Sequence, residues 1–159
     1  MITLRALRLA DLDMVYQWEN NPELWHVSEQ KGPFSRAEIE AFVEKCVDES
    51  NPEITRWLIC RGEHAIGAVD LFDMDNKLNQ CGIGIFILEQ KNRNYGYATI
   101  ALKSALTRLS KSGIESVIAI IFDDNQASRR LFLRAGFIPG RSLIYNGKHA
   151  TRFSLSLPI

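Results

Sequence analysis

A segment of the chain, Arg93-Asn94-Tyr95-Gly96-Tyr97-Ala98-Thr99, has the composition of a phosphate-binding turn. It follows an apolar stretch that predicts a buried strand and precedes a stretch with helical periodicity. The small residues Gly96 and Ala98 would let a ligand approach the backbone, and free N–H groups at a helix start bind phosphate oxygens. We therefore expect a diphosphate site, with an ordinary strand–helix turn as the alternative. The segment is neither a Walker loop nor a three-glycine dinucleotide fingerprint.

A second motif follows the next predicted strand and extends from Asn125 through Ser128 to Phe137. The side chain of Asn125 is suited to cap a short helix, and the apolar residues after it would pack on a sheet. Capping and packing alone would explain this motif. The other interpretation is that Asn125 and Ser128 contact a ligand held by the first segment.

The elements that would position these motifs form a mixed α/β (α+β) pattern in a single domain that spans residues 1–159. Ser35 and Glu38 form a capping box at a helix start, and Asn146-Gly147 is a favoured hairpin dipeptide. The order predicts a mostly antiparallel sheet with one β-α-β crossover. We expect strands at 2–8, 55–60, 65–72, 81–88 and 115–122, two more strands around the hairpin, and helices at 11–20, 35–49, 96–111 and 125–135.

Charge and composition narrow the function classes. Nineteen basic and nineteen acidic residues give a formal charge of zero, so no overall field would hold nucleic acid or an anionic membrane. Residues 11–53 nevertheless hold eleven acids and three bases, a net charge of −8. This segment is either a solvated helix face or a region that faces a cationic ligand.

The three cysteines have no CxxC spacing and the three histidines lie far apart, so we expect no metal site and a reducing compartment. The start of the chain has no apolar targeting segment, and no stretch reaches eighteen apolar residues. The expected location is therefore the cytoplasm.

The two motifs, in this order and topology, resemble the GNAT acetyltransferase superfamily over essentially the whole chain. The early segment Trp18-Glu19-Asn20-Asn21-Pro22, with the acidic helix after it, looks most like the subgroup of spermidine and ribosomal-protein N-terminal acetyltransferases. The resemblance implies a mixed, mostly antiparallel sheet of six to seven strands flanked by about four helices. In this fold the fourth and fifth strands splay apart and leave a cleft.

The resemblance also implies acetyl-CoA as cosubstrate, and no metal. Backbone amides of the first segment would hold the pyrophosphate, and the end of the fourth strand would bind the pantetheine and polarise the thioester carbonyl. Asn125 and Ser128 would contact the far side. The implied cofactor-binding residues are Ile87, Leu88, Arg93, Asn94, Tyr95, Gly96, Tyr97, Ala98, Thr99, Asn125 and Ser128.

Two departures from the family pattern affect the expected acid–base chemistry. Phe132 stands where the family often has a tyrosine that protonates the leaving thiolate, and Gly82 stands where related sequences often have a glutamate. Asp70, Asp73, Tyr145 or a water chain could substitute, or water could protonate the thiolate unaided. Asn125 is a further catalytic candidate. A CoA-binding regulatory domain without catalysis is the alternative.

The expected acceptor is a primary amine. A polyamine comes first, because the acidic segment would cover the acceptor side, and a protein N-terminal amine is close behind. An aminoglycoside or another amino compound is third. The candidate acceptor-binding residues are Glu19, Glu23, Trp25, His26 and Glu29, each of which could equally have a surface role. A homodimer is possible.

Overall fold

The computed structural model describes residues 1–26, 32–50 and 53–158, and it contains one seven-stranded sheet in the order β1-β2-β3-β4-β5-β7-β6. Every neighbouring pair is antiparallel except β4 and β5, which are parallel. The predicted mixed, mostly antiparallel sheet is therefore confirmed. The strands are β1 (Ile2–Ala6), β2 (Ile54–Arg61), β3 (His64–Asp75), β4 (Gln80–Ile87), β5 (Ser116–Phe122), β6 (Ile138–Tyr145) and β7 (Lys148–Ser156).

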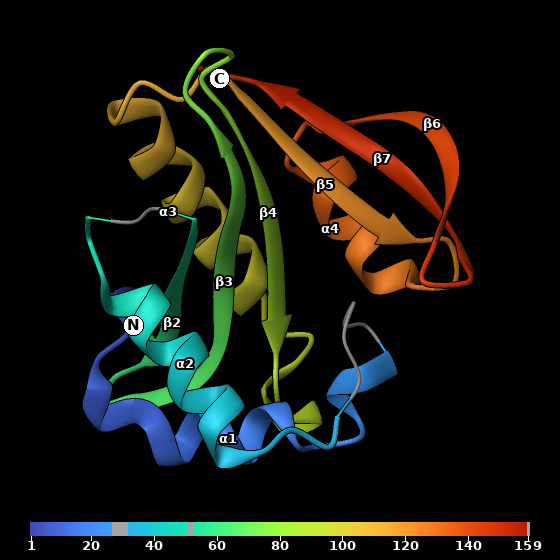
Figure 1. Ribbon diagram of the computed structural model, residues 1–159. Coiled ribbons are helices and arrows are strands. Elements are labelled where there is room, and N and C mark those ends of the chain that lie inside the picture. Colours follow the sequence, from blue (N-terminus) through green and yellow to red (C-terminus); the bar gives the residue numbers. More distant parts are fainter. Residues whose placement is uncertain (27–31, 51–52, 159) are drawn as a thin grey trace.

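Helices cover both faces of this sheet, as the alternating burial of its strands requires. Apolar side chains of α1 and α2 pack on Leu58 and Ala68 at one face. Those of α3 and α4 pack on Ile59 and Val69 at the other, in a larger core (Figure 1). The helices are α1 (Leu12–Glu19), α2 (Arg36–Val47), α3 (Tyr97–Lys111) and α4 (Gln126–Arg134), with single 3-10 turns at Leu9–Asp11, Leu24–His26 and Gln90–Asn92.

Local signals place several element ends where the sequence predicts them. At the start of α2, the N–H of Glu38 donates to Ser35 Oγ at 3.1 Å, and the N–H of Ser35 donates to Glu38 Oε1 at 3.0 Å. This confirms the capping box. Asn146 and Gly147 have φ angles of 48° and 79°, which is the left-handed pair that a tight β6–β7 hairpin needs.

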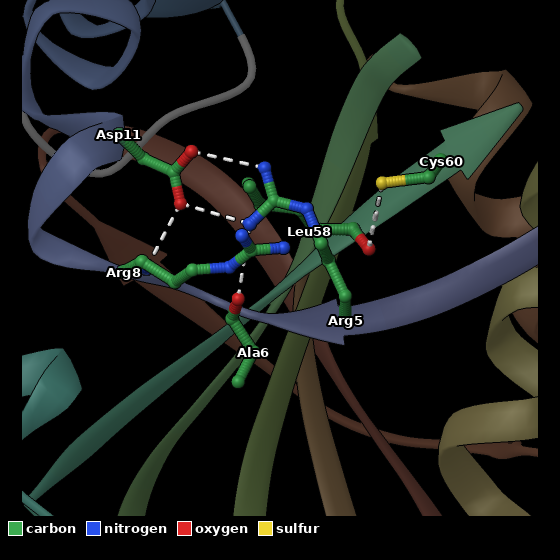
Figure 2. Close-up of polar contacts among 6 residues, drawn as sticks. All are labelled: Arg5, Ala6, Arg8, Asp11, Leu58 and Cys60. Atoms are coloured by element: carbon green, nitrogen blue, oxygen red, sulfur yellow. Dashed lines mark hydrogen bonds and ion pairs between the residues drawn. The ribbon is translucent and has the colours of Figure 1, made fainter. Parts of the chain in front are cut away.

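The N-terminal strand is fastened to the turn before α1 by a bidentate ion pair. The two terminal nitrogens of Arg5 each donate to an oxygen of Asp11 at 2.9 Å, and the backbone N–H of Arg8 donates to Asp11 Oδ2 at 2.8 Å (Figure 2). The hydrogen bonds from the Arg5 side chain lower the pKa of Asp11 below its ordinary value.

The strands that carry the site depart from regular pairing in two places. β4 pairs with β5 only through Gln80–Gly82, after which the two strands diverge, so the predicted splay is confirmed (Figure 1). In the β2–β3 hairpin, Cys60 pairs with Ala65 but Ile59 pairs with Gly67, so Ile66 is an extra residue in a β-bulge.

The third strand is longer than predicted. The predicted strand ends at Phe72, but β3 continues to Asp75, which pairs with Gln80. The pairing between these two points is irregular, and Asp73 has a left-handed φ of 50°. Polar residues that resemble a turn in the sequence therefore lie in a bulged continuation of the strand.

Candidate active site

A cavity of about 880 Å³ opens where β4 and β5 diverge. Its walls are the ends of both strands, the segment that leads into α3, and one side of α4. Among the predicted cofactor-binding residues, the cavity lining includes Ile87, Leu88, Arg93, Asn94, Gly96, Tyr97, Ala98, Thr99, Asn125 and Ser128. Tyr95 is not among the lining residues, and its exposed ring stacks on Tyr97 with the ring centroids 5.5 Å apart.

The turn before α3 and the first residues of this helix line the cavity. Asn94 and Gly96 have φ angles of 66° and 78°, and Gly96 is the N-cap of α3. The first N–H groups of the helix lack intrahelical partners and lie at the positive end of its dipole. A Cβ built on Gly96 would meet no atom within 4 Å, so glycine is favoured there by its backbone conformation rather than by crowding.

The backbone at the end of β4 is only partly available to a ligand. The N–H of Leu88 donates to the carbonyl oxygen of Ile66 on β3 at 2.9 Å. Because antiparallel pairs alternate, the N–H and C=O groups of Ile87 and Ile85 face away from β3 and toward the splay. Ile85 lines the cavity and was not predicted from the sequence. The Arg93 side chain donates to the carbonyl oxygens of Ile87 at 3.2 Å and Leu88 at 3.0 Å.

On the opposite wall, Asn125 caps α4. Its side chain accepts a hydrogen bond from the N–H of Ser128 at 3.2 Å, which confirms the capping interpretation, while both residues also line the cavity. Phe132 is buried in the same wall and packs edge-to-face on Phe137, with the ring centroids 4.9 Å apart. This position therefore presents a hydrocarbon ring to the cavity and no ionisable group.

A second cavity, of about 620 Å³, lies on the α1–α2 side of the splay. It shares a wall with the first cavity, and that shared wall contains only apolar side chains and one glycine: Leu24, Ile83, Gly84, Ile85, Phe86, Ile120 and Phe122. Two spaces of molecular size therefore meet across an apolar junction at the point where β4 and β5 separate.

The polar lining of the second cavity is dominated by carboxylates. Glu19, Glu38, Asp70 and Asp73 line it together with one cationic residue, Arg56. Tyr145 also lines it, with its ring 6.2 Å from that of Phe122 at the junction. Hydrogen bonds from Ser35 lower the pKa of Glu38 below its ordinary value, so this carboxylate stays ionised at neutral pH.

Arg56 is a functional candidate that sequence reasoning missed. Its side chain is only 3% exposed, and its Nε and Nη2 donate to the two oxygens of Asp70 at 2.7 and 2.8 Å. Nη2 also lies 2.8 Å from Glu19 Oε1. Burial alone would lower the pKa of Arg56, but its attraction to these two carboxylates outweighs that effect and raises the pKa. Strand register places Arg56 directly opposite Asp70, and Glu19 approaches from the end of α1.

The predicted acceptor-binding residues do not all lie in this second cavity. Glu19 lines it, as does the catalytic candidate Asp70, whereas Glu23 lines the first cavity. Trp25 lines neither, and its indole N–H donates to the carbonyl oxygen of Glu19 at 2.8 Å. The side chain of His26 and the whole of Glu29 lie outside the described residues.

The environment of Gly82 explains why a glutamate would not fit there. A Cβ at this position would lie 2.4 Å from a carbon of the Phe72 ring, which is far inside normal contact distance. The ring of Phe72 therefore occupies the space into which a side chain at position 82 would project, and Phe72 itself forms part of the second cavity.

Two of the cysteines, Cys46 and Cys81, are poor nucleophiles. Burial raises the pKa of the Cys46 thiol to about 12 and that of Cys81 to about 11, so neither is a thiolate at neutral pH. In the described part of the chain, no three His, Cys, Asp or Glu side chains converge as a metal site would require. None of the helices described is long and apolar enough to span a membrane.

Comparison with known proteins gives a consistent result. Residues 1–138 match the acetyltransferase (GNAT) domain family. The fold matches that of the spermidine N-acetyltransferase from Vibrio cholerae, solved with CoA and spermine, with a TM-score of 0.86 and 20% identity over 98% of this chain and 95% of that chain. It also matches a domain from Methanocaldococcus jannaschii, with a TM-score of 0.82 and 21% identity over 99% of each chain.

A third similar structure is the microcin C7 self-immunity acetyltransferase MccE, solved with acetyl-CoA and AMP. Its TM-score is 0.81, with 19% identity over 98% of this chain and 92% of that chain. No curated protein matches the sequence significantly.

Proposed function

The chain belongs to the acetyltransferase (GNAT) domain family, and we infer that it transfers the acetyl group of acetyl-CoA to a cationic primary amine. The observation that carries this inference is the pair of cavities that meet at the β4–β5 splay. One cavity has the backbone and helix terminus of a diphosphate site, and the other is rich in carboxylates. Such an arrangement lets both substrates bind at once, so that the amine attacks the thioester directly.

The first cavity suits acetyl-CoA in size and in the groups that it presents. The N–H groups at the start of α3 would bind the diphosphate, with Arg93 beside them. The backbone of Ile85 and the N–H of Ile87 would hold the pantetheine and donate to the thioester oxygen as negative charge develops there, while the carbonyl oxygen of Ile87 accepts from Arg93. Asn125 and Ser128 would contact the cofactor from α4.

The second cavity suits an acceptor that carries positive charge. Four carboxylates against one guanidinium leave a net charge of −3 on its lining side chains. Both leading acceptors, a polyamine and a protein N-terminal amine, have an ammonium group that this field would attract. Glu19 and Asp70 would act through their charge, because both already bind Arg56.

The apolar junction gives a physical route to the reactive form of the amine. An ammonium group that moves from the carboxylate-lined cavity into this wall loses hydration, which lowers its pKa and favours the neutral amine. The nitrogen then bonds to the acetyl carbon as the C–S bond breaks. The neutral amine loses one proton overall and the CoA thiolate gains one. Because Phe132 has no proton to give, water would supply the proton that the thiolate gains. The candidate side chains for proton transfer remain Asn125 at the first cavity and Asp70 and Tyr145 at the second.

The test is thiol release from acetyl-CoA across a panel of spermidine, spermine, diamines, N-terminal peptides and aminoglycosides. We expect release with at least one cationic amine, and a higher melting temperature when acetyl-CoA binds the native state. If no amine in the panel caused thiol release and acetyl-CoA did not raise the melting temperature, the proposal would be overturned. A thermal shift without thiol release would point to a CoA-binding domain without turnover.

A further inference from the structure

Nine of the ten glycines are explained by the fold itself. Five have a left-handed φ, which favours a residue without a Cβ: Gly62, Gly96, Gly113, Gly136 and Gly147. Four others are crowded, because a Cβ there would lie 3.0 Å or less from a neighbouring atom: Gly32, Gly67, Gly82 and Gly140. Gly84 belongs to neither group, so its presence in the middle of β4 calls for another reason.

Both the backbone and the space at Gly84 would accept an alanine. Its φ lies outside the left-handed region, and a Cβ built on it would have one atom of the described residues within 4 Å, a ring carbon of Phe72 at 3.8 Å. That distance is ordinary van der Waals contact. Glycine inside a strand is less stable than alanine, because it loses more conformational freedom on folding. The protein thus gives up stability at this position without a structural need.

Gly84 lies where the two cavities meet. It is one of the seven residues that line both, and the other six carry apolar side chains. Because Gly84 pairs with Asp70 on β3, a side chain at position 84 would project on the same face as Asp70, which is the face of the second cavity. Its neighbours Ile83 and Ile85 pack toward the core on the opposite face. The missing side chain therefore leaves a gap in the apolar wall.

We propose that Gly84 is the point of passage at which the acceptor amine reaches the thioester, so that the acetyl transfer, and not the fold, requires a residue without a side chain there. This role rests on the proposed acetyl transfer, to which it adds one residue. The attacking nitrogen comes from the second cavity and the acetyl carbon is held in the first, so the nitrogen must cross the wall that they share. A glycine in a strand lets a ligand approach the backbone closely.

The deciding variant is Gly84→Ala, which adds one methyl group to the passage. Thiol release from acetyl-CoA is measured for this variant and for the wild type with spermidine, spermine, diamines, N-terminal peptides and aminoglycosides. For each amine that the wild type acetylates, we expect kcat/KM to fall about 10-fold or more, since a displacement of the reacting atoms by about 1 Å can cost about 100-fold. The dissociation constant for CoA should change by less than about 3-fold, because the methyl group would project on the side of the second cavity.

The same variant should be more stable than the wild type. Alanine in place of a glycine inside a strand should raise the melting temperature by about 1–3 °C. A loss of turnover together with a gain in stability is a result that a purely structural role of Gly84 would not produce. Gly82→Ala is the matched contrast, because Gly82 lies two residues earlier in β4, lines neither cavity and would place its Cβ 2.4 Å from the Phe72 ring. The melting temperature of Gly82→Ala should fall.

Two results would overturn this role of Gly84 and leave the proposed acetyl transfer intact. In the first, Gly84→Ala acetylates every amine as fast as the wild type does. In the second, its melting temperature falls as that of Gly82→Ala does, which would mean that the fold itself requires glycine at position 84. If instead the wild type releases no thiol with any amine, the proposed transfer fails and the role of Gly84 fails with it.

Discussion

Substitution of Gly96 by glutamate gives the sharpest test of the diphosphate site. Gly96 has a left-handed φ of 78°, which costs an L-residue about 1 kcal/mol, but a side chain there meets no atom within 4 Å. We therefore expect Gly96→Glu to fold with a melting temperature lower by roughly 2–4 °C. Its carboxylate would stand at the predicted place of the diphosphate.

The expected loss of affinity follows from the charge. Two like charges about 4 Å apart repel by about 1 kcal/mol in water and about 4 kcal/mol at the effective dielectric of a protein surface. The dissociation constant for CoA should therefore rise between about 5-fold and 1,000-fold in isothermal titration calorimetry. The loss should shrink as salt is added, because the site is exposed to solvent.

A matched control lies at the other end of the same helix. Gly113 follows α3 with a φ of 93°, and a Cβ there also meets no atom within 4 Å. Gly113→Glu thus carries similar strain and the same charge away from the cavity. Gly96→Gln introduces a side chain of nearly the same size without the charge, so it separates the steric effect on CoA binding from the electrostatic one. If Gly96→Glu and Gly113→Glu bound CoA equally well, the assignment of this turn to the diphosphate would be refuted.

Three further outcomes are expected. Gly82→Ala should lower the free energy of unfolding by about 1–3 kcal/mol in urea titrations, because its Cβ meets the Phe72 ring. In the double variant, Phe72→Leu should restore part of the lost free energy. If the effects of the two single substitutions simply added in the double variant, the contact would be disproved. Because its pKa is lowered in the folded state, ionised Asp11 stabilises the fold at pH values above the ordinary carboxyl pKa, and this stabilisation is lost as the pH falls through the pKa that Asp11 has in the folded protein. Asp11→Asn should therefore be less stable than the wild type at pH 7 and should lose less stability on acidification below about pH 4. Parallel curves of stability against pH for the two proteins would contradict this prediction. Cys46, whose pKa is raised to about 12 by burial, should react with iodoacetamide at pH 8 far more slowly than free cysteine, and comparable rates would disprove its burial.

The features that could be predicted from the sequence are those whose causes lie close together in the chain. The capping box at Ser35 and Glu38 and the hairpin at Asn146-Gly147 each depend on a few neighbouring residues, and both are present. The turn before α3 was recognisable for the same reason, because its small and basic residues are contiguous. The candidate cofactor side could therefore be outlined before the fold was known.

The second cavity could not be outlined in this way, because its walls come from α1, α2 and five of the strands. Arg56 lies in a strand with apolar neighbours, and its spacing gives no sign that it is buried. Its role depends on the register that places it opposite Asp70 and on the approach of Glu19 from α1. Asp70 was predicted as a candidate base, but its carboxylate is bound by a partner that the sequence did not reveal.

The bulge at Ile66 fixes which residues of the β2–β3 hairpin meet. If the pairing of Arg61 with His64 and of Cys60 with Ala65 continued without the extra residue, Arg56 would stand opposite Val69 instead of Asp70. A shift of one residue also exchanges the two faces of a strand, so charged groups of the cavity would enter the apolar core. The length of this hairpin, counted in single residues, thus decides which charged groups line the second cavity, and a deletion there would change that lining from outside the cavity.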